Sequence, residues 1–110
     1  VSGIGVNQGT GTLRANRCQG NQVHGIELWN GARGEAVGNV CEGNGDSGIA
    51  AFDAGTTPVL RANRCNQNGK WGIAYQRAAT PQVGQDNTAV GNGLGPLRAA
   101  PEDMQHYGSQ

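Results

Sequence analysis

The feature that most constrains this chain is a repeat of about 23 residues. A Gly–Ile pair recurs four times, and the steps between the glycines are 22, 23 and 24 residues. Two sets of asparagines and one set of cysteines keep nearly the same steps: Asn16, Asn39, Asn63 and Asn87; Asn21, Asn44, Asn68 and Asn92; Cys18, Cys41 and Cys65. A fixed period of this length indicates a solenoid, in which each unit buries its apolar side chains by stacking on its neighbours.

The composition decides which kind of solenoid. With 20 glycines in 110 residues, every candidate helix is interrupted, and no segment carries the 3.6-residue apolar stripe of a helical repeat. Five leucines are too few for leucine-rich repeats. Each unit instead holds short runs of alternating apolar and polar residues between Gly, Asn and Thr, which is typical of short strands joined by turns. We therefore predict an all-β parallel β-helix of about four rungs of 22–24 residues, spanning residues 1–93.

Equivalent residues should then stack in columns about 4.8 Å apart, the spacing of hydrogen-bonded strands. The columns predicted to face inward are Ile4, Ile26, Ile49 and Ile73; Val6, Leu28, Ala51 and Tyr75; Leu13, Ala36, Leu60 and Gly84; and Cys18, Cys41, Cys65 and Ala89. We interpret the cysteines as small apolar core residues. An odd number of cysteines, widely spaced and without a repeating histidine, favours neither disulfides nor a metal site.

The asparagine columns need a separate explanation, because a buried amide is costly unless it is hydrogen-bonded. Asparagine tolerates the left-handed backbone of a sharp corner, and stacked amides can donate and accept between rungs. We therefore predict that Asn16, Asn39, Asn63 and Asn87 form a structural ladder, and that the column from Asn21 to Asn92 lies in a turn.

The segments GIELWNGARGEAVGNVCEGN and GIAAFDAGTTPVLRANRCNQN resemble the right-handed parallel β-helix repeats of the pectate-lyase-like superfamily. The resemblance implies a right-handed coil. It leaves the function open, because that superfamily contains polysaccharide lyases and epimerases as well as repeat domains without known chemistry. Residues 94–110 lack the pattern, and we expect them to form either a cap, through Leu94, Leu97, Met104 and Tyr107, or a linker.

Charge and side-chain chemistry exclude several classes of function. Eight basic and eight acidic residues give a net charge of zero, so we expect neither a nucleic-acid nor a membrane partner. The acidic residues fall in different columns, which argues against a calcium cage or a hydrolase pair, and His24 has no acid recurring in its own column. We expect no catalytic residue, no metal and no cofactor.

A binding face is better supported by the pattern. If the alternation holds, Trp29 and Phe52 point outward and stack on adjacent rungs, near Asn30, Asp53 and Arg77. Aromatic rings beside amide and acid groups suit a sugar, although a protein partner, the tail or a second copy could cover the same face. We therefore expect a non-catalytic scaffold or binding module for a carbohydrate or protein partner, within a larger protein or assembly. Its predicted contact residues are Glu27, Trp29, Asn30, Phe52, Asp53 and Arg77.

Two alternatives remain beside this reading. The chain could be a fragment of a polysaccharide lyase or epimerase. Its first rung shows no cap, so this end could meet further rungs or pair with another copy as a homo-oligomer.

Overall fold

The structure, a computed structural model, describes residues 2–98. In this range the chain forms eleven short strands and no helix, and every strand pair is parallel. The strands are β1 (Ile4–Asn7), β2 (Thr12–Arg14), β3 (Arg17–Gln19), β4 (Ile26–Trp29), β5 (Glu35–Val37), β6 (Val40–Glu42), β7 (Ile49–Phe52), β8 (Val59–Arg61), β9 (Trp71–Gln76), β10 (Gln82–Val83) and β11 (Gly95–Arg98).

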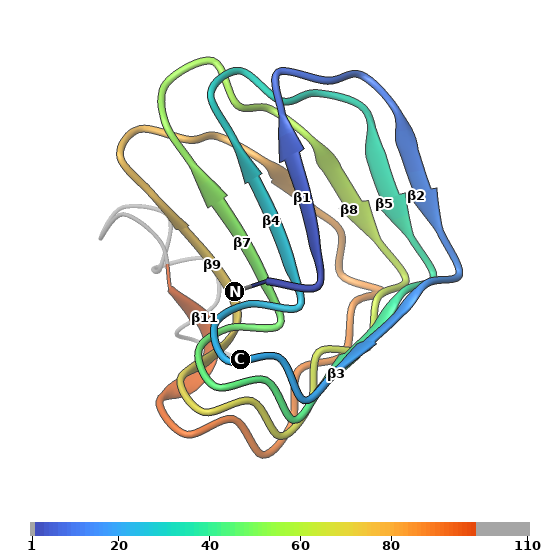
Figure 1. Ribbon diagram of the computed structural model, residues 1–110, viewed down its shortest axis with the longest axis vertical. Helices are drawn as coiled ribbons and strands as arrows, with labels where there is room; N and C mark the ends of the chain where they lie inside the picture. Colours follow the sequence, from blue (N-terminus) through green and yellow to red (C-terminus); the bar gives the residue numbers. More distant parts are fainter. Residues whose placement is uncertain (1, 99–110) are drawn as a thin grey trace.

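Successive rungs place their strands in three sheets around one axis, as Figure 1 shows. The largest sheet has the order β1-β4-β7-β9-β11, the second has the order β10-β8-β5-β2, and the third pairs β3 with β6. Single bridges from Val40 to Arg64 and from Arg64 to Thr88 extend the third sheet to the later rungs. The predicted all-β parallel β-helix of about four rungs is confirmed.

The predicted columns are reproduced by the strand register. Ile4 pairs with Ile26, Ile26 with Ile49 and Ile49 with Ile73, and Cys18 pairs with Cys41. These side chains and their column partners form one apolar core along the axis. Burying a large aliphatic side chain contributes roughly 1.5–3 kcal/mol, so the stabilisation is distributed over the whole stack.

The glycine before each isoleucine is required by close packing. A Cβ atom on Gly48 would lie 2.7 Å from the carbonyl oxygen of Gly72 and 2.8 Å from the Cβ of Cys65. The same contacts recur one rung earlier at Gly25. The chain therefore passes too close to its neighbours here for any side chain, which explains why the Gly–Ile pair marks every rung.

One predicted column position is wrong. We expected Gly84 to follow Leu60 in the core, but the residue that pairs with Leu60 is Val83, which packs against the core. The reason is one additional residue in the fourth rung: three positions separate Leu60 from Asn63, whereas four separate Val83 from Asn87. The extra residue is absorbed in a turn, where the backbone N–H of Asn87 donates to the carbonyl of Gly84.

The asparagine ladder is confirmed by its hydrogen bonds. The Nδ2 of Asn39 donates to the Oδ1 of Asn63 at 2.9 Å and to the carbonyl oxygen of Leu13 at 2.9 Å. The Oδ1 of Asn39 accepts from the backbone N–H and the Nδ2 of Asn16. The column from Asn21 to Asn92 repeats this pattern. Both corners are therefore held by amides that bond from rung to rung.

The three cysteines are buried free thiols stacked on one another. Burial, together with the neighbouring Cys41, raises the pKa of Cys18 to about 11. The pKa of Cys41 is also raised, by its hydrogen bond to Cys65 and by burial. Cys18 and Cys41 therefore stay protonated at neutral pH, and the buried column acts as apolar filling, as predicted.

The β-helix continues past residue 93, where we placed the end of the repeats. Strand β11 adds to β9, with Leu97 paired to Ile73. Leu97 is 4% exposed and joins the core, whereas Leu94 is 60% exposed. Leu97 thus covers the last rung, while the other two proposed cap residues, Met104 and Tyr107, lie outside the described residues.

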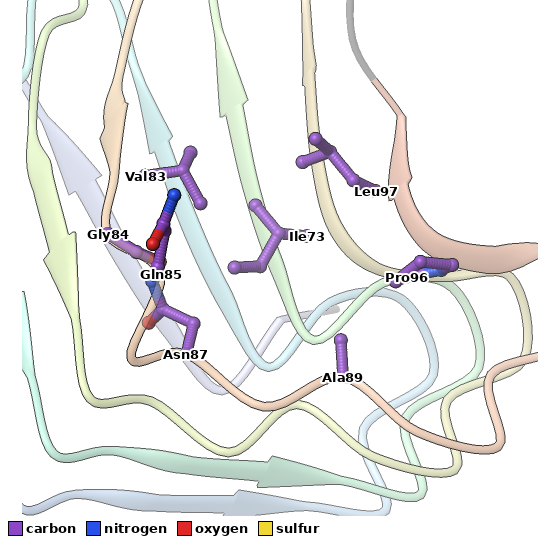
Figure 2. A pocket seen from close by; sticks show the side chains of 8 residues that line it. All are labelled: Ile73, Val83, Gly84, Gln85, Asn87, Ala89, Pro96 and Leu97. Atoms are coloured by element: carbon purple, nitrogen blue, oxygen red, sulfur yellow. Dashed lines mark hydrogen bonds between the residues drawn. The ribbon is translucent and has the colours of Figure 1, made fainter. Parts of the chain in front are cut away.

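A cavity of about 290 Å³ lies at this end of the stack, between the fourth rung and β11. Figure 2 shows Ile73, Val83, Ala89 and Leu97 around it, with Asn87 at its border. Ala89 occupies the column that holds cysteine in the first three rungs, so the smaller side chain contributes to the hollow.

Candidate functional site

The outer face of the largest sheet carries two columns of outward-facing side chains. They are Gly5, Glu27, Ala50 and Ala74; and Asn7, Trp29, Phe52 and Gln76. The first column is small except for Glu27, and Ala50 and Ala74 are fully buried although they lie outside the core cluster. Ser2, His24 and Ser47 precede these strands and are joined from rung to rung by hydrogen bonds.

Each of the first three rungs turns three corners with a positive φ, and the fourth rung has a positive φ only after the largest and the third sheet. The chain fills these corners differently. The corner after the second sheet holds Ala15, Gly38 and Ala62, and the corner after the third holds Gly20, Gly43, Gln67 and Gly91. The turn after the largest sheet begins with Gln8, Asn30, Asp53 and Arg77, with φ between 54° and 85°, and a positive φ recurs later in these turns at Gly31, Gly34, Gly55 and Ala78. We call the column of Gln8, Asn30, Asp53 and Arg77 the polar corner. No glycine occupies this first position, although glycine is the residue that adopts such a conformation without strain.

The side chains of the polar corner bond to one another along the axis. The backbone N–H of Asn30 donates to the Oδ2 of Asp53 at 3.2 Å, and the Nδ2 of Asn30 donates to the Oδ1 of Asn7 at 3.0 Å. The other carboxylate oxygen of Asp53 lies 3.0 Å from the Nε of Arg77. Asn30, Asp53 and Arg77, which we predicted to be neighbours, are thus joined in one network across three rungs.

Phe52 connects this network to the outer face of the sheet. The guanidinium carbon of Arg77 lies 4.8 Å from the centroid of the Phe52 ring, a cation–π distance. On its other side the ring contacts His24, with centroids 5.7 Å apart and planes tilted by 49°. Asp53, Arg77, Phe52 and His24 therefore form a continuous chain of contacts, with the Phe52 ring half-buried.

The expected stacking of Trp29 on Phe52 is not what the structure shows. Within residues 2–98, the ring that contacts Phe52 is His24, and no ring contact joins it to Trp29. The indole lies instead over Gly5, where a Cβ atom would come within 3.0 Å of its Cη2. The reason is that Gly5 leaves open space on the preceding rung, so Trp29 leans away from Phe52. Both rings are half-buried and belong to one outer face, but they present separate surfaces.

Glu27 and His24 lie at the opposite end of these strands. The hydroxyl of Ser2 donates to the Oε1 of Glu27 at 2.8 Å, and the Nδ1 of His24 accepts from the backbone N–H of Ser47 at 3.3 Å. Burial lowers the pKa of His24 below 6.5, against the opposing effect of Asp46 and Glu27. The imidazole is therefore neutral at neutral pH and oriented by the next rung.

Two members of this surface were missed by sequence reasoning. Gln8 begins the polar corner, and His24 contacts Phe52, yet neither was among the expected contact residues. A signal for Gln8 was present: Gln8, Asn30, Asp53 and Arg77 are separated by 22, 23 and 24 residues, the steps of the Gly–Ile pairs. No such signal existed for His24, because its contact with Phe52 depends on how two side chains lean.

Among residues 2–98, no group of three or more His, Cys, Asp or Glu side chains is arranged to hold a metal ion. The same part of the chain contains no helix that is long and apolar enough to cross a membrane.

Comparison with known proteins identifies the family. The family model described as the right-handed β-helix region matches residues 1–101. No curated protein and no solved structure matches the chain. The match spans nearly the whole sequence and agrees with the parallel three-sheet coil of Figure 1. The chain therefore belongs to the right-handed β-helix family.

Proposed function

We propose that this chain is a non-catalytic β-helix module that binds a carbohydrate or protein partner at the polar corner and the adjoining outer face of the largest sheet. The proposed contact residues are Glu27, Trp29, Asn30, Phe52, Asp53 and Arg77, to which we add Gln8 and His24. The site would serve a longer protein or a larger assembly.

The observation that carries the proposal is that a polar side chain holds the first positive-φ position after the largest sheet in all four described rungs, whereas glycine or alanine holds the later positive-φ positions of the same turns. The other two corners use glycine or alanine at six of their seven positive-φ residues, so the fold itself does not require a polar side chain there. Backbone strain of roughly 1–3 kcal/mol for a non-glycine residue in this region is usually retained where the side chain has a use. Gln8, Asn30, Asp53 and Arg77 bear it on four consecutive rungs.

The chemistry of the surface suits recognition of a polar ring or a peptide. The half-buried Phe52 ring lies 4.8 Å from the guanidinium carbon of Arg77, and the ion pair with Asp53 orients that guanidinium before a ligand arrives. Preorganised donors beside an aromatic face lose little entropy on binding. The half-buried indole of Trp29 gives a second apolar contact on the neighbouring rung.

The first rung supports the idea of a larger assembly. Its inward side chains Ile4, Val6 and Leu13 are only half-buried, whereas their partners Ile26, Leu28 and Ala36 are buried. Additional rungs or a second copy would complete their burial, which favours association through this end.

The experiment compares Arg77→Gly with Ala62→Gly. Both changes place glycine at a positive φ, but only the first removes a side chain from the polar corner. Arg77→Gly should leave the melting temperature nearly unchanged, because relief of strain offsets the loss of an exposed ion pair worth at most about 1 kcal/mol. It should abolish binding to a neutral-glycan array or to a partner captured by cross-linking, whereas Ala62→Gly should retain binding.

Equal binding by Arg77→Gly and the wild type would refute the proposed site. The choice between partners follows from Trp29→Ala: weaker oligosaccharide binding would identify a carbohydrate partner, whereas dissociation of a dimer in solution would identify a second copy. Cleavage of a uronate polymer above the blank rate, lost in His24→Ala, would instead establish the lyase or epimerase alternative.

A further inference from the structure

His24 is a titratable side chain that is buried where the repeat does not require a histidine. It is 6% exposed, and the equivalent residues of the neighbouring rungs are Ser2 and Ser47. Two contacts fix its imidazole. The Nδ1 accepts the backbone N–H of Ser47 at 3.3 Å, and the ring lies against that of Phe52, with centroids 5.7 Å apart. The imidazole therefore joins the backbone of the next rung to the outer face of the largest sheet.

Only the neutral imidazole can make the contact with Ser47. A protonated ring carries a hydrogen on both nitrogens, so its Nδ1–H would face the N–H of Ser47, donor against donor. Ser47 is 1% exposed, so water has little access to replace the lost acceptor. A protonated His24 must therefore turn away from Ser47, and this rotation also changes its contact with Phe52.

The charged groups around His24 do not hold an imidazolium in its present place. They are Glu27 on its own strand, Asp46 and Lys70 in the turns before β7 and β9, the α-amino group of the chain, and Arg77 beside Phe52. Glu27 accepts from the Ser2 hydroxyl, and Asp46 accepts from the Ser47 hydroxyl and lies 3.7 Å from Lys70. Within residues 2–98, neither carboxylate forms an ion pair with the imidazole.

The Phe52 ring transmits a movement of His24 to the polar corner. The guanidinium carbon of Arg77 lies 4.8 Å from the centroid of this ring, and the Nε of Arg77 lies 3.0 Å from the Oδ1 of Asp53. An imidazolium that stayed beside the ring would be a second cation against a face that Arg77 already uses. An imidazolium that left would take away the neighbour against which the ring packs. Either change alters the contact that positions Arg77.

We propose that His24 is a pH-sensitive switch of the polar corner: the neutral imidazole holds Phe52 against Arg77 in the binding arrangement, and protonation breaks this arrangement and releases the partner. The inference rests on the proposed function, because it assigns a regulator to that same surface. Only molecules with a neutral His24 would bind, so the apparent affinity should fall in proportion to their fraction. Release should therefore occur as the pH falls from 7 towards 5.

An NMR titration of the whole chain tests the switch without a ligand. The imidazole C2 proton of His24, the amide of Ser47, the ring protons of Phe52 and the Nε–H of Arg77 should all change with one midpoint. Phe52 is the single phenylalanine, and the variant His106→Asn identifies the signals of the second histidine, which lies outside the described residues. In His24→Asn, the signals of Phe52 and Arg77 should no longer show this midpoint.

The variant Lys70→Gln moves the switch without altering a contact residue. Lys70 lowers the pKa of His24, so its removal should shift the shared midpoint to higher pH. The matched control, Arg33→Gln, removes one positive charge from an exposed position and should leave the midpoint unchanged. Separate midpoints for His24 and Phe52, or the same midpoint in Lys70→Gln and Arg33→Gln, would overturn the switch.

Binding to the neutral-glycan array, measured at pH 5 and pH 7, tests the release. The wild type should bind about threefold or more weakly at pH 5, whereas the ratio between the two pH values should be close to one in His24→Asn. An equal decrease in both proteins would overturn the proposal and assign the effect to a carboxylate such as Asp53. The proposed function itself fails on a different result, which is equal binding of Arg77→Gly and the wild type at pH 7.

Discussion

The stability of this molecule depends first on single amides. Asn39 is completely buried, yet each polar atom of its side chain is used: Oδ1 accepts two hydrogen bonds and Nδ2 donates two. Across residues 2–98, no buried side-chain nitrogen or oxygen lacks a hydrogen-bond partner. The unfavourable free energy of burying an amide in a narrow core is therefore offset by hydrogen bonds only while the neighbouring rungs are folded.

The first prediction concerns this dependence. Asn39→Ala should lower the free energy of unfolding by roughly 1–3 kcal/mol more than Asn30→Gly does, because it removes the acceptor of the backbone N–H and the Nδ2 of Asn16 and the side-chain donor to the carbonyl of Leu13. Asn30→Gly is the matched control, since Asn30 is exposed and glycine accepts its φ of 60°. Urea unfolding followed by circular dichroism measures both, and equal midpoints would contradict the ladder's role.

The second prediction concerns pH. Folding lowers the pKa of His24 below 6.5, chiefly through burial, so the unfolded chain binds the proton more tightly. Stability should therefore decrease as the pH falls from 7 towards 5 and recover as it rises. His24→Asn keeps an acceptor for the N–H of Ser47 and should show a shallower loss over this window. Parallel thermal melts from pH 5 to pH 7 compare the two proteins, and identical slopes would show that other groups cause the dependence.

At the scale of strands and turns, the repeat in the sequence predicts which residues stack in each column. The inward columns follow from the spacing of identical residues, because equal steps place equivalent residues over each other. The sequence predicted Gly84 in the column position that Val83 occupies. This error arose because one additional residue between Val83 and Asn87 shifts strand β10 while Asn87 keeps its place in the ladder. The lean of Trp29 towards Gly5 was missed for a different reason: periodicity fixes which face a side chain occupies but not its rotamer.

The last strand gives the third prediction. Leu97 covers the fourth rung, so Leu97→Ala should destabilise the protein by about 2–3 kcal/mol and enlarge the cavity beside Ile73 and Val83. Leu94→Ala, three residues earlier at an exposed position, should change the stability by less than about 0.5 kcal/mol. Chemical denaturation of both variants is the measurement, and similar effects would mean that β11 contributes no core packing.

For the molecule as a whole, the stabilising contacts between rungs follow one direction, the axis of the β-helix. Each rung contacts the rungs before and after it, and the strand pairs all join neighbouring rungs. Solenoids of this kind behave as a sum of unit stabilities and interface terms between neighbours. Within residues 2–98 the first and the last rung each contact one neighbouring rung, so opening of this chain should begin at these two rungs and spread inward.

The fourth prediction follows from this arrangement. In native-state hydrogen exchange, amides of β4 and β7 should be the slowest, and those of β1 and β11 should exchange earlier, because they lie at the edges of the sheet. Mass spectrometry of peptides from each rung, or NMR of single amides, would give the order. Uniform protection from β1 to β11 would indicate one cooperative unit rather than a stack.

The direction of the amide ladder has a consequence for how such a chain can change in length. The interior asparagines Asn39 and Asn63 each accept from the asparagine of the preceding rung and donate to the asparagine of the following rung. The two boundaries of an interior coil therefore offer matching donors and acceptors. A whole coil can therefore be duplicated or deleted, and the rungs on either side can form the same asparagine hydrogen bonds with each other. A partial coil cannot be inserted or deleted in this way, because it would move the asparagine side chains out of their column and away from their hydrogen-bond partners.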